Sequence, residues 1–350
     1  MKLLFALIAA FSLFASAALA DEGGGPYKVL KSVTVGGEGR WDDLTVDADN
    51  RRLYISRTSR VDVYDADSLQ KVGEIADTNG VHGIAIDPNS GHGFTSNGRD
   101  PSVTMFDIKT LEVIKKIGVA GSPDGIFFEP ATKHVFVESH RDPNETVIDA
   151  ADGKVLGTID LGGEPEQGAG DGNGHVYVNL ESTSEVAVVD PAAMKVTARY
   201  KLGEGDRPSG MGLDAKNHRI FACCGNEKMV VLDADNGNIL ATLPTGRGTD
   251  AGTFDPDTME AFSSNGDGTL TVVKENSPTS FEVEQNVMTK PGARTCALDA
   301  KTHNVYLVTA QFEAPATRPG AATQTASGGQ RRQRPRMIPG SFMLLVVGKS

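Results

Sequence analysis

Short runs of alternating hydrophobic and polar residues recur along the chain at a nearly constant interval. The phrase LTVDADNRRLYIS at residues 44–56 returns as IAIDPNSGHGFTS at residues 84–96 and as IFFEPATKHVFVE at residues 126–138. An acidic residue, here called the anchor, marks each of seven copies: Asp47, Asp87, Glu129, Asp171, Asp214, Asp255 and Asp299. Successive anchors are separated by 40 residues (47 to 87) to 44 residues (255 to 299). A fixed period of this size indicates a repeat architecture.

Each copy predicts four short strands. Two alternating runs flank a turn of Asp, Asn, Pro or Gly, which is typical of a tight hairpin. A third run follows, such as VDVYDADS from Val61, and then a fourth, such as VTARYKL from Val196. Four strands in about 42 residues form one blade of a β-propeller. The sequence therefore predicts an all-β, seven-bladed propeller that occupies residues 26–350 as a single domain.

The seventh copy lacks its fourth strand. It supplies two strands within residues 295–309 and a third in SFMLLVVGKS, after which the sequence ends. The run YKVLKSVTV at residues 27–35 precedes the first anchor and belongs to no other copy. We therefore expect the N-terminal strand to close the last blade.

The first twenty residues have the features of a cleavable signal peptide. Lys2 is followed by an apolar run over residues 3–19, and the segment closes on Ala18-Leu19-Ala20. A positive charge, a short apolar stretch and a small-x-small ending direct a chain to secretion. We expect cleavage after Ala20, a periplasmic or secreted protein, and no transmembrane segment once the signal peptide is removed.

Charge and cysteine content narrow the class further. The chain has 34 basic and 46 acidic residues, a net charge of −12, and this acidity argues against nucleic acid as a partner. Three cysteines are too few for a disulfide-built scaffold. Since Cys223 and Cys224 are adjacent, they should not both point inward from a regular strand, so we expect half-buried thiols or a strained vicinal disulfide. We expect a monomer.

A low-complexity segment interrupts the last copy over residues 311–340. It is rich in Ala, Thr, Gly, Gln and Pro and carries Arg331, Arg332, Arg334 and Arg336. Such a composition predicts a basic loop inserted in the last blade. The loop could be solvated, could fold over an acidic rim as a removable cover, or could tether an anionic polymer or membrane surface.

The repeat phrase resembles that of a known family. HVYVNLESTSEVAVVDPAAMKVTARYKLGE at residues 175–204 is similar to the YVTN-type repeat of YncE-like exported bacterial propellers. The resemblance implies an exported propeller, in a family mostly without an assigned reaction; neighbouring superfamilies include lactonases and quinoprotein dehydrogenase subunits. The Trp-Asp dipeptide of WD40 proteins occurs once, at Trp41-Asp42, ahead of a strand, which disfavours a WD40 protein proper although the fold is WD40-like.

The loops that lead into the innermost strands of a propeller open on one face around the channel, where ligands usually bind. The residue five before each anchor, here called a ring residue, should lie there: Asp42, His82, Asp124, Glu166, Ser209, Asp250 and Arg294. The predicted ligand-binding set comprises six of these, without Ser209, together with Arg40, Trp41 and Arg207. Four carboxylates and a histidine among seven positions make the mouth a candidate binding site.

Four ring residues could ligate a metal ion. Asp42, His82, Asp124 and Glu166 come from consecutive copies, and carboxylates favour a hard divalent cation such as Ca²⁺ or Mg²⁺. A solvated polar rim that binds nothing is the alternative, because neighbouring blades should hold these side chains apart. Five histidines fall in hairpin turns on the opposite face, which we expect to be too scattered for a metal cluster: His92, His134, His175, His218 and His303.

The function expected from these features is binding without catalysis. No catalytic residue is assigned, because the common hydrolase, metalloprotease, nucleotide and c-type haem signatures do not occur in the sequence. We expect an exported binding or scaffold propeller that presents a loop-built face to a protein or small-molecule ligand. The alternative is a metal-assisted hydrolase or lyase that acts on lactone-like molecules at the channel mouth, with His82 as acid or base.

Overall fold

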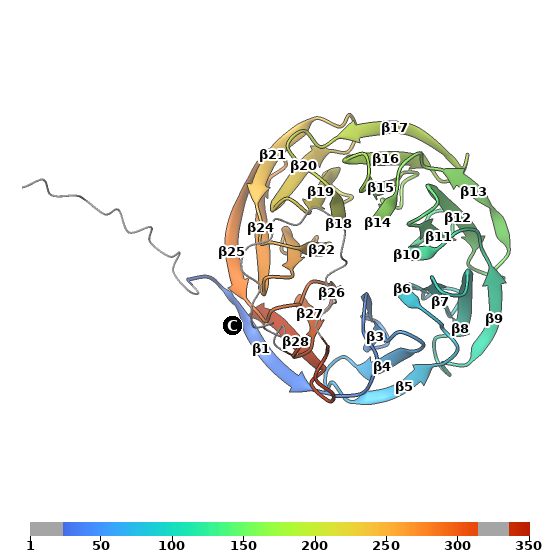
Figure 1. The fold of residues 1–350 in the computed structure, drawn as a ribbon. Helices are drawn as coiled ribbons and strands as arrows, with labels where there is room; N and C mark the ends of the chain where they lie inside the picture. Colours follow the sequence, from blue (N-terminus) through green and yellow to red (C-terminus); the bar gives the residue numbers. More distant parts are fainter. Residues whose placement is uncertain (1–23, 314–335) are drawn as a thin grey trace, which may run out of the picture.

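Seven four-stranded antiparallel sheets surround a central channel, as Figure 1 shows. The computed structural model describes residues 24–313 and 336–350, and these contain 28 strands and no helix. The all-β, seven-bladed prediction is therefore confirmed. The predicted signal peptide and the arginines of the inserted loop, apart from Arg336, lie outside the described residues.

The strands of each blade run from the channel outward in sequence order. Blade 1 contains β2 (Leu44–Asp47), β3 (Arg52–Ser56), β4 (Val61–Asp65) and β5 (Lys71–Ile75). Blade 2 contains β6 (Val81–Asp87), β7 (His92–Asn97), β8 (Ser102–Asp107) and β9 (Val113–Gly118). Blade 3 contains β10 (Pro123–Glu129), β11 (His134–Ser139), β12 (Asn144–Asp149) and β13 (Val155–Asp160). Blade 4 contains β14 (Pro165–Gly170), β15 (Val176–Leu180), β16 (Glu185–Asp190) and β17 (Lys195–Lys201).

The remaining blades follow the same order, except that the last one takes its outer strand from the N-terminus. Blade 5 contains β18 (Pro208–Asp214), β19 (Arg219–Cys224), β20 (Lys228–Asp233) and β21 (Ile239–Pro244). Blade 6 contains β22 (Thr249–Asp255), β23 (Glu260–Asn265), β24 (Thr269–Ser277) and β25 (Ser280–Met288). Blade 7 contains β26 (Cys296–Asp299), β27 (Asn304–Thr309), β28 (Met343–Lys349) and β1 (Tyr27–Thr34).

The anchor carboxylates recur because they hold the hairpin turn between the first two strands of a blade. Asp47 Oδ1 accepts a hydrogen bond from the backbone N–H of Asn50 at 3.0 Å, and Asp214 Oδ1 accepts one from Lys216 at 2.9 Å. The same turns contain left-handed residues such as Arg51 (φ 54°) and His218 (φ 57°). A short acceptor side chain satisfies backbone donors that such a turn leaves without partners.

Each blade is buried on both faces because it is sandwiched between two neighbours. The cluster between blades 3 and 4, for example, joins Phe136 and Val147 to Val176 and Val178. Seven such hydrophobic clusters surround the channel. The core is therefore a ring of interfaces between blades.

This arrangement corrects the expectation for the adjacent cysteines. Cys223 and Cys224 are both 0% exposed and both free. Their side chains point to opposite faces of β19, and Cys223 packs in the cluster shared with blade 6 while Cys224 packs in the cluster shared with blade 4. The expectation assumed a sheet with one buried face, which a propeller blade does not have. Burial raises the pKa of both thiols.

The N-terminal strand closes the ring, as predicted. In Figure 1, β1 lies beside β28, and the register runs from Tyr27 opposite Lys349 to Thr34 opposite Met343. Tyr27 also joins blade 7 to blade 6: its hydroxyl donates to Glu260 Oε2 at 2.5 Å, and its backbone N–H donates to Gln285 Oε1 at 2.9 Å.

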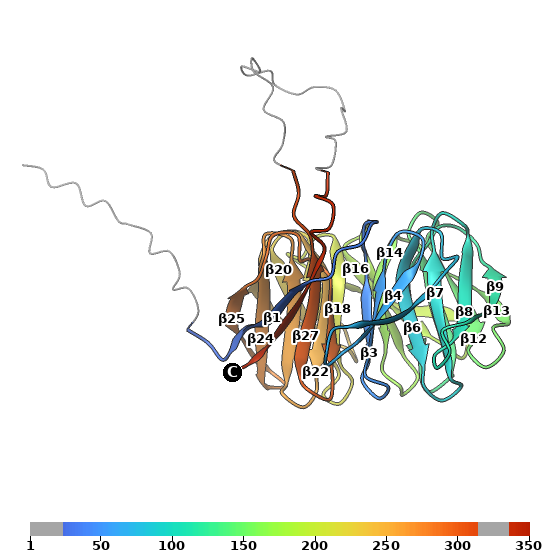
Figure 2. The ribbon, with the colours of Figure 1, turned by 90° about the horizontal axis from the view of Figure 1, so that it is seen from below.

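The two described ends of the segment inserted in blade 7 extend from one face of the propeller, as Figure 2 shows. These ends continue as a short ladder, in which Glu313 N–H donates to Arg336 O and Ile338 N–H donates to Gln311 O, both at 2.8 Å. The ring of Trp41 lies 6.0 Å from that of Phe312 in this base. The path of the residues between the two ends, and with it the proposed cover, lies outside the described residues.

Removal of β1 should destabilise the whole ring. A chain that begins at Gly36 leaves β28 without its ladder partner and exposes the site of Tyr27, which is 2% exposed. Losing a buried aromatic residue costs about 3 kcal/mol, and each kcal/mol shifts Tm by about 2–4 °C for a domain of about 150–250 residues. Because the shift per kcal/mol is smaller in a domain of this size, we expect calorimetry to show a Tm lower by about 5 °C or more than for a chain that begins at Gly24. Ser32→Ala, a change on the exposed side of β1, should leave Tm unchanged; equal Tm values for the two chain lengths would refute the role of β1.

Candidate functional site

The innermost strands and the loops that enter them surround a channel cavity of about 740 Å³. All seven ring residues line it: Asp42, His82, Asp124, Glu166, Ser209, Asp250 and Arg294. Arg207 also lines the cavity, whereas the residues found there include neither Arg40 nor Trp41. A cavity of this volume suits a small-molecule ligand, for which sites of roughly 300–1,000 Å³ are usual.

Trp41 is placed differently from the expectation because its indole packs away from the channel. The ring lies 5.2 Å from that of Phe342 and belongs to the hydrophobic cluster between blades 7 and 1. An apolar ring gains more from burial against other aromatic rings than from a position on a polar rim. The order of residues along the loop did not reveal the direction of this side chain.

Hydroxyl groups from the second strands hold the ring residues in place. Ser56 Oγ accepts a hydrogen bond from Asp42 N–H and donates one to Asp43 O, both at 3.0 Å. In blade 2, Ser96 Oγ accepts from Gly83 N–H at 2.9 Å and donates to Asp124 O in the next blade. The backbone at the channel mouth is thereby fixed both within a blade and between neighbours.

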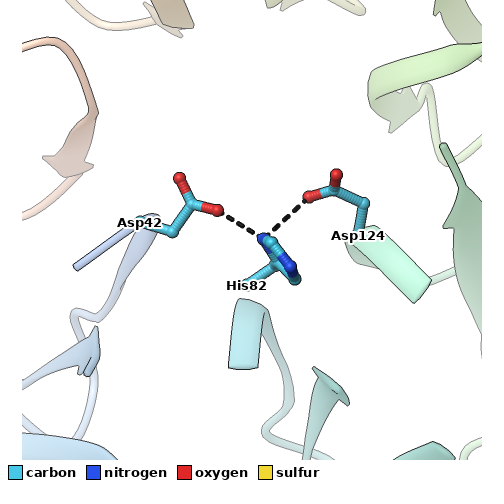
Figure 3. Close-up of side chains that lie close together, drawn as sticks. All are labelled: Asp42, His82 and Asp124. Atoms are coloured by element: carbon cyan, nitrogen blue, oxygen red, sulfur yellow. Dashed lines mark hydrogen bonds and ion pairs between the residues drawn. The ribbon is translucent and has the colours of Figure 1, made fainter. Parts of the chain in front are cut away.

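Three ring residues from blades 1, 2 and 3 converge on one point. Figure 3 shows Asp42 and Asp124 on either side of the imidazole of His82. His82 Nδ1 lies 2.5 Å from Asp42 Oδ2 and 3.2 Å from Asp124 Oδ1. The potential ligand atoms of the three residues all lie within 4.8 Å of one another. About a third of each side chain is exposed, so solvent ions can reach the cluster.

Electrostatics at this cluster favour a positive charge between the two carboxylates. Burial alone would lower the pKa of His82, but the hydrogen bond to Asp42 and the charges of Asp124 and Asp42 outweigh it, and the pKa is raised. Burial raises the pKa of Asp124, against the opposing charge of His82. A single Nδ1–H cannot be fully shared by two carboxylates. A cation in place of this proton would satisfy all three groups.

The structure does not bring Glu166 to the other three predicted metal ligands. Glu166 Oε1 instead lies 3.0 Å from His140 Nδ1, and this contact raises the pKa of His140 to about 9. Glu181 is close to both but is paired with the guanidinium of Arg207. Because these carboxylates already have cationic partners, His140, Glu166, Glu181 and Arg207 form an ion-pair network.

The far side of the mouth is neutralised by an arginine. Arg294 Nη1 lies 2.6 Å from Asp250 Oδ2, and Arg294 Nη2 lies 3.8 Å from Asp42 Oδ1. Ser209 turns toward the next blade and donates to Thr249 O at 3.0 Å. The ring is therefore acidic on the arc of blades 1 to 3 and balanced elsewhere.

Sequence reasoning missed Gln167, the residue after a ring residue. Gln167 Oε1 accepts from the N–H groups of Met211 at 3.0 Å and Gly252 at 3.1 Å, and its Nε2 donates to Gly252 O at 3.0 Å. One side chain thus ties the innermost strands of blades 4, 5 and 6 together. The repeat indicates that Gln167 is unusual, because the other six copies have a shorter side chain, or none, at the position after the ring residue. These residues are Asp43, Gly83, Gly125, Gly210, Ala251 and Thr295.

One histidine of the hairpin turns also departs from the expectation. His303 Nδ1 lies 2.8 Å from Asp255 Oδ2, and Asp257 is close enough to complete a group of three. The hairpin turns of blades 6 and 7 therefore lie nearer to each other than we expected. Asp255 Oδ1 also accepts a hydrogen bond from the backbone N–H of Asp257 in its own turn. The contact between Asp255 and His303 therefore joins two neighbouring turns.

Part of the chain is similar to a known protein family. Residues 39–171 match the YNCE-like β-propeller family. This match, with the seven blades, confirms the resemblance that the repeat phrase shows. No curated protein matches the chain.

Solved propeller structures are similar over nearly the whole chain. The RRP9 WD40 repeats are 10% identical with a TM-score of 0.72, covering 92% of this chain and 98% of that one. U3-55K is 10% identical with a TM-score of 0.71, covering 93% and 99%. At this identity the likeness shows the WD40-like fold alone. Over the described residues, no helix is long and apolar enough to cross a membrane.

The contact between Asp42 and His82 gives a direct prediction. Asp42→Asn removes the hydrogen-bonded charge that raises the pKa of His82, so this pKa should fall. NMR titration of the imidazole ring measures it. Asp235→Asn, which alters the contact of Asp235 with His218, is the matched control and should not change the pKa of His82. An unchanged pKa in Asp42→Asn would show that the two side chains do not meet in solution.

Proposed function

We propose that the protein is a noncatalytic, exported binding propeller that holds a small ligand at the channel mouth through a divalent cation bound by Asp42, His82 and Asp124. The observation that carries the proposal is the convergence of three ligand atoms within 4.8 Å at the edge of a cavity of about 740 Å³. A propeller fold is compatible with a binding or scaffold role. The export is supported by the signal-like sequence of residues 1–20.

The cluster suits a small divalent cation. Metal–ligand bonds of about 2.0–2.2 Å to nitrogen and oxygen place neighbouring ligand atoms roughly 3 Å apart. The observed separations of 2.5 Å and 3.2 Å from His82 Nδ1 need only small side-chain rotations to reach that arrangement. Imidazole favours Zn²⁺ and carboxylates favour Mn²⁺, so this mixed set fits either ion better than the Ca²⁺ or Mg²⁺ expected for carboxylates alone.

The rest of the mouth indicates the chemistry of the ligand. Three protein ligands leave coordination positions of the cation open to the cavity. Arg207 and Arg294 line the same cavity with side chains that are 67% and 44% exposed. A cation close to the guanidinium of Arg294, in a cavity that Arg207 also lines, favours an oxygen-rich anion. Carboxylate oxygens can bind the metal and accept hydrogen bonds from arginine at once. A small carboxylate is the class of ligand that we propose.

A metal-assisted hydrolase or lyase of lactone-like molecules is a second candidate. It is favoured by the same open coordination positions, since catalytic metal sites keep a place for water. Metal-dependent hydrolysis of lactones that is lost in Asp124→Ala would establish this reading in place of a noncatalytic one. Binding of small carboxylates without turnover of lactones would support the noncatalytic proposal.

Cation binding can be measured by calorimetry with Mn²⁺ and Zn²⁺. His82→Ala and Asp124→Ala each remove one ligand and should weaken binding by more than about tenfold. Lowering the pH below the raised pKa of His82 should also weaken binding, because the proton and the metal compete for Nδ1. His175→Ala, which removes an exposed imidazole that faces Asp171, is the control and should bind as the wild type does. Unchanged affinity in both ligand variants would remove the cluster from consideration.

A further inference from the structure

Blade 3 contains two completely buried glutamates side by side. Glu138 on β11 and Glu145 on β12 are cross-strand partners, and each is 0% exposed. They follow the same alternation as Phe136 and Val147, so they lie on the face of blade 3 that packs against blade 4. Neither lines the channel cavity. We refer to them as the glutamate pair.

The pair is confined to this blade of the repeat. At the third-strand position of Glu145, the other six blades all have a buried hydrophobic residue: Val61, Val103, Val186, Met229, Leu270 and Leu344. At the second-strand position of Glu138 they have small or neutral residues: Ser56, Ser96, Asn179, Cys223, Ser264 and Val308. Blade 3 therefore departs from the repeat at two touching positions at once.

Two glycines make room for the carboxyl group of Glu138. A Cβ added to Gly125 would lie 2.8 Å from Glu138 Oε2, and one added to Gly168 would lie 2.7 Å from Oε1. At the position of Gly168, five of the other six blades have a larger apolar residue: Leu44, Ile84, Ile126, Met211 and Cys296. The space that a hydrophobic side chain fills elsewhere is thus occupied here by a carboxyl group, directly behind the channel wall.

The pair has no donor to stabilise its charge. Among the described residues, none of its four carboxyl oxygens has a hydrogen-bond partner. The charged groups that act on Glu138 from neighbouring strands are also carboxylates, Asp124 on β10 and Glu166 on β14, and His140 beyond the end of β11 is taken up by Glu166. Two adjacent carboxylates in an apolar interface cannot both be ionised without a large cost.

We propose that Glu138 and Glu145 form a proton-binding site in the wall of the channel, in which one carboxyl group keeps its proton and donates a hydrogen bond to the other. A proton is the one cation that needs no cavity of its own, and it converts one acceptor into a donor. No other reactant takes part: the pair holds the proton at low pH and releases it to water as the pH rises. The proposal does not rest on ligand binding at the mouth.

The pair makes the interface of blades 3 and 4 sensitive to pH. Burial raises the pKa of both groups, that of Glu145 to about 8. A carboxyl group with a higher pKa in the folded than in the unfolded state binds protons more tightly when folded, so its contribution to stability falls as the pH rises from about 4.3 toward the raised value. At alkaline pH two like charges face blade 4. Glu138 lies on β11, which pairs with the strand of Asp124 and contacts the strand of Glu166.

Thermal unfolding as a function of pH tests the site. Between about pH 5 and pH 9, Glu138→Gln and Glu145→Gln should each flatten the fall in Tm and should exceed the wild-type Tm at the alkaline end, because a neutral amide keeps the shape without the charge. Glu112→Gln, an exposed carboxyl group of the same protein, is the control and should follow the wild type. Equal slopes in the wild type and both pair variants would overturn the proposal.

A second measurement starts from the wild-type protein. Carbon-13 NMR of labelled glutamate carboxyl groups in the wild-type protein should show resonances that stay protonated well above the ordinary pKa of about 4.3. In whichever glutamine variant folds, at least one of these resonances should disappear and the partner should titrate at lower pH, since the amide now donates to it. Burial also raises the pKa of Glu275, to about 7, so the pair is recognised by the resonance that a glutamine variant removes. If that resonance titrated near the ordinary value in the wild type, the proton-binding site would be refuted.

Discussion

The pairing of β1 with β28 is the interaction on which the rest of the structure depends. A blade has two hydrophobic faces, and both are buried only when the ring is closed. Tyr27 contributes to the cluster between blades 6 and 7 and donates a hydrogen bond to Glu260, so closure joins neighbouring blades as well as strands. Once closed, the ring points seven innermost strands at one axis, and residues separated by some 40 positions in sequence share a single cavity.

The features that repeat in the sequence could be predicted, because the backbone repeats with them. The anchors indicated the hairpins, and counting back five residues from each anchor placed all seven ring residues at the mouth. The direction of individual side chains could not be predicted in this way. Trp41 turns to aromatic neighbours, and Glu166 turns to His140, because contacts outside the repeat decide between rotamers of similar energy.

Departures from the repeat carry information that the repeat itself does not. Glu145 stands where six blades have hydrophobic residues, and Gly168 stands where five have larger apolar ones. Aligning the third strands would have revealed Glu145 from the sequence, and aligning the first strands would have revealed Gly168. What the sequence could not show is that Glu138, Glu145 and the two glycines meet at one interface, since that depends on how blade 3 packs against blade 4.

The same electrostatic requirement operates at the mouth and in the wall. Carboxylates that are removed from water need a positive charge, and space decides which one. The side chains of Asp42 and Asp124 are partly open to solvent around His82, so a metal ion can enter. The glutamate pair is completely buried, and there the cation that we propose is a proton. The most direct test of the central claim is anomalous diffraction from crystals soaked in Mn²⁺. The account predicts a peak between Asp42, His82 and Asp124; a peak elsewhere, or none at this cluster, would contradict it.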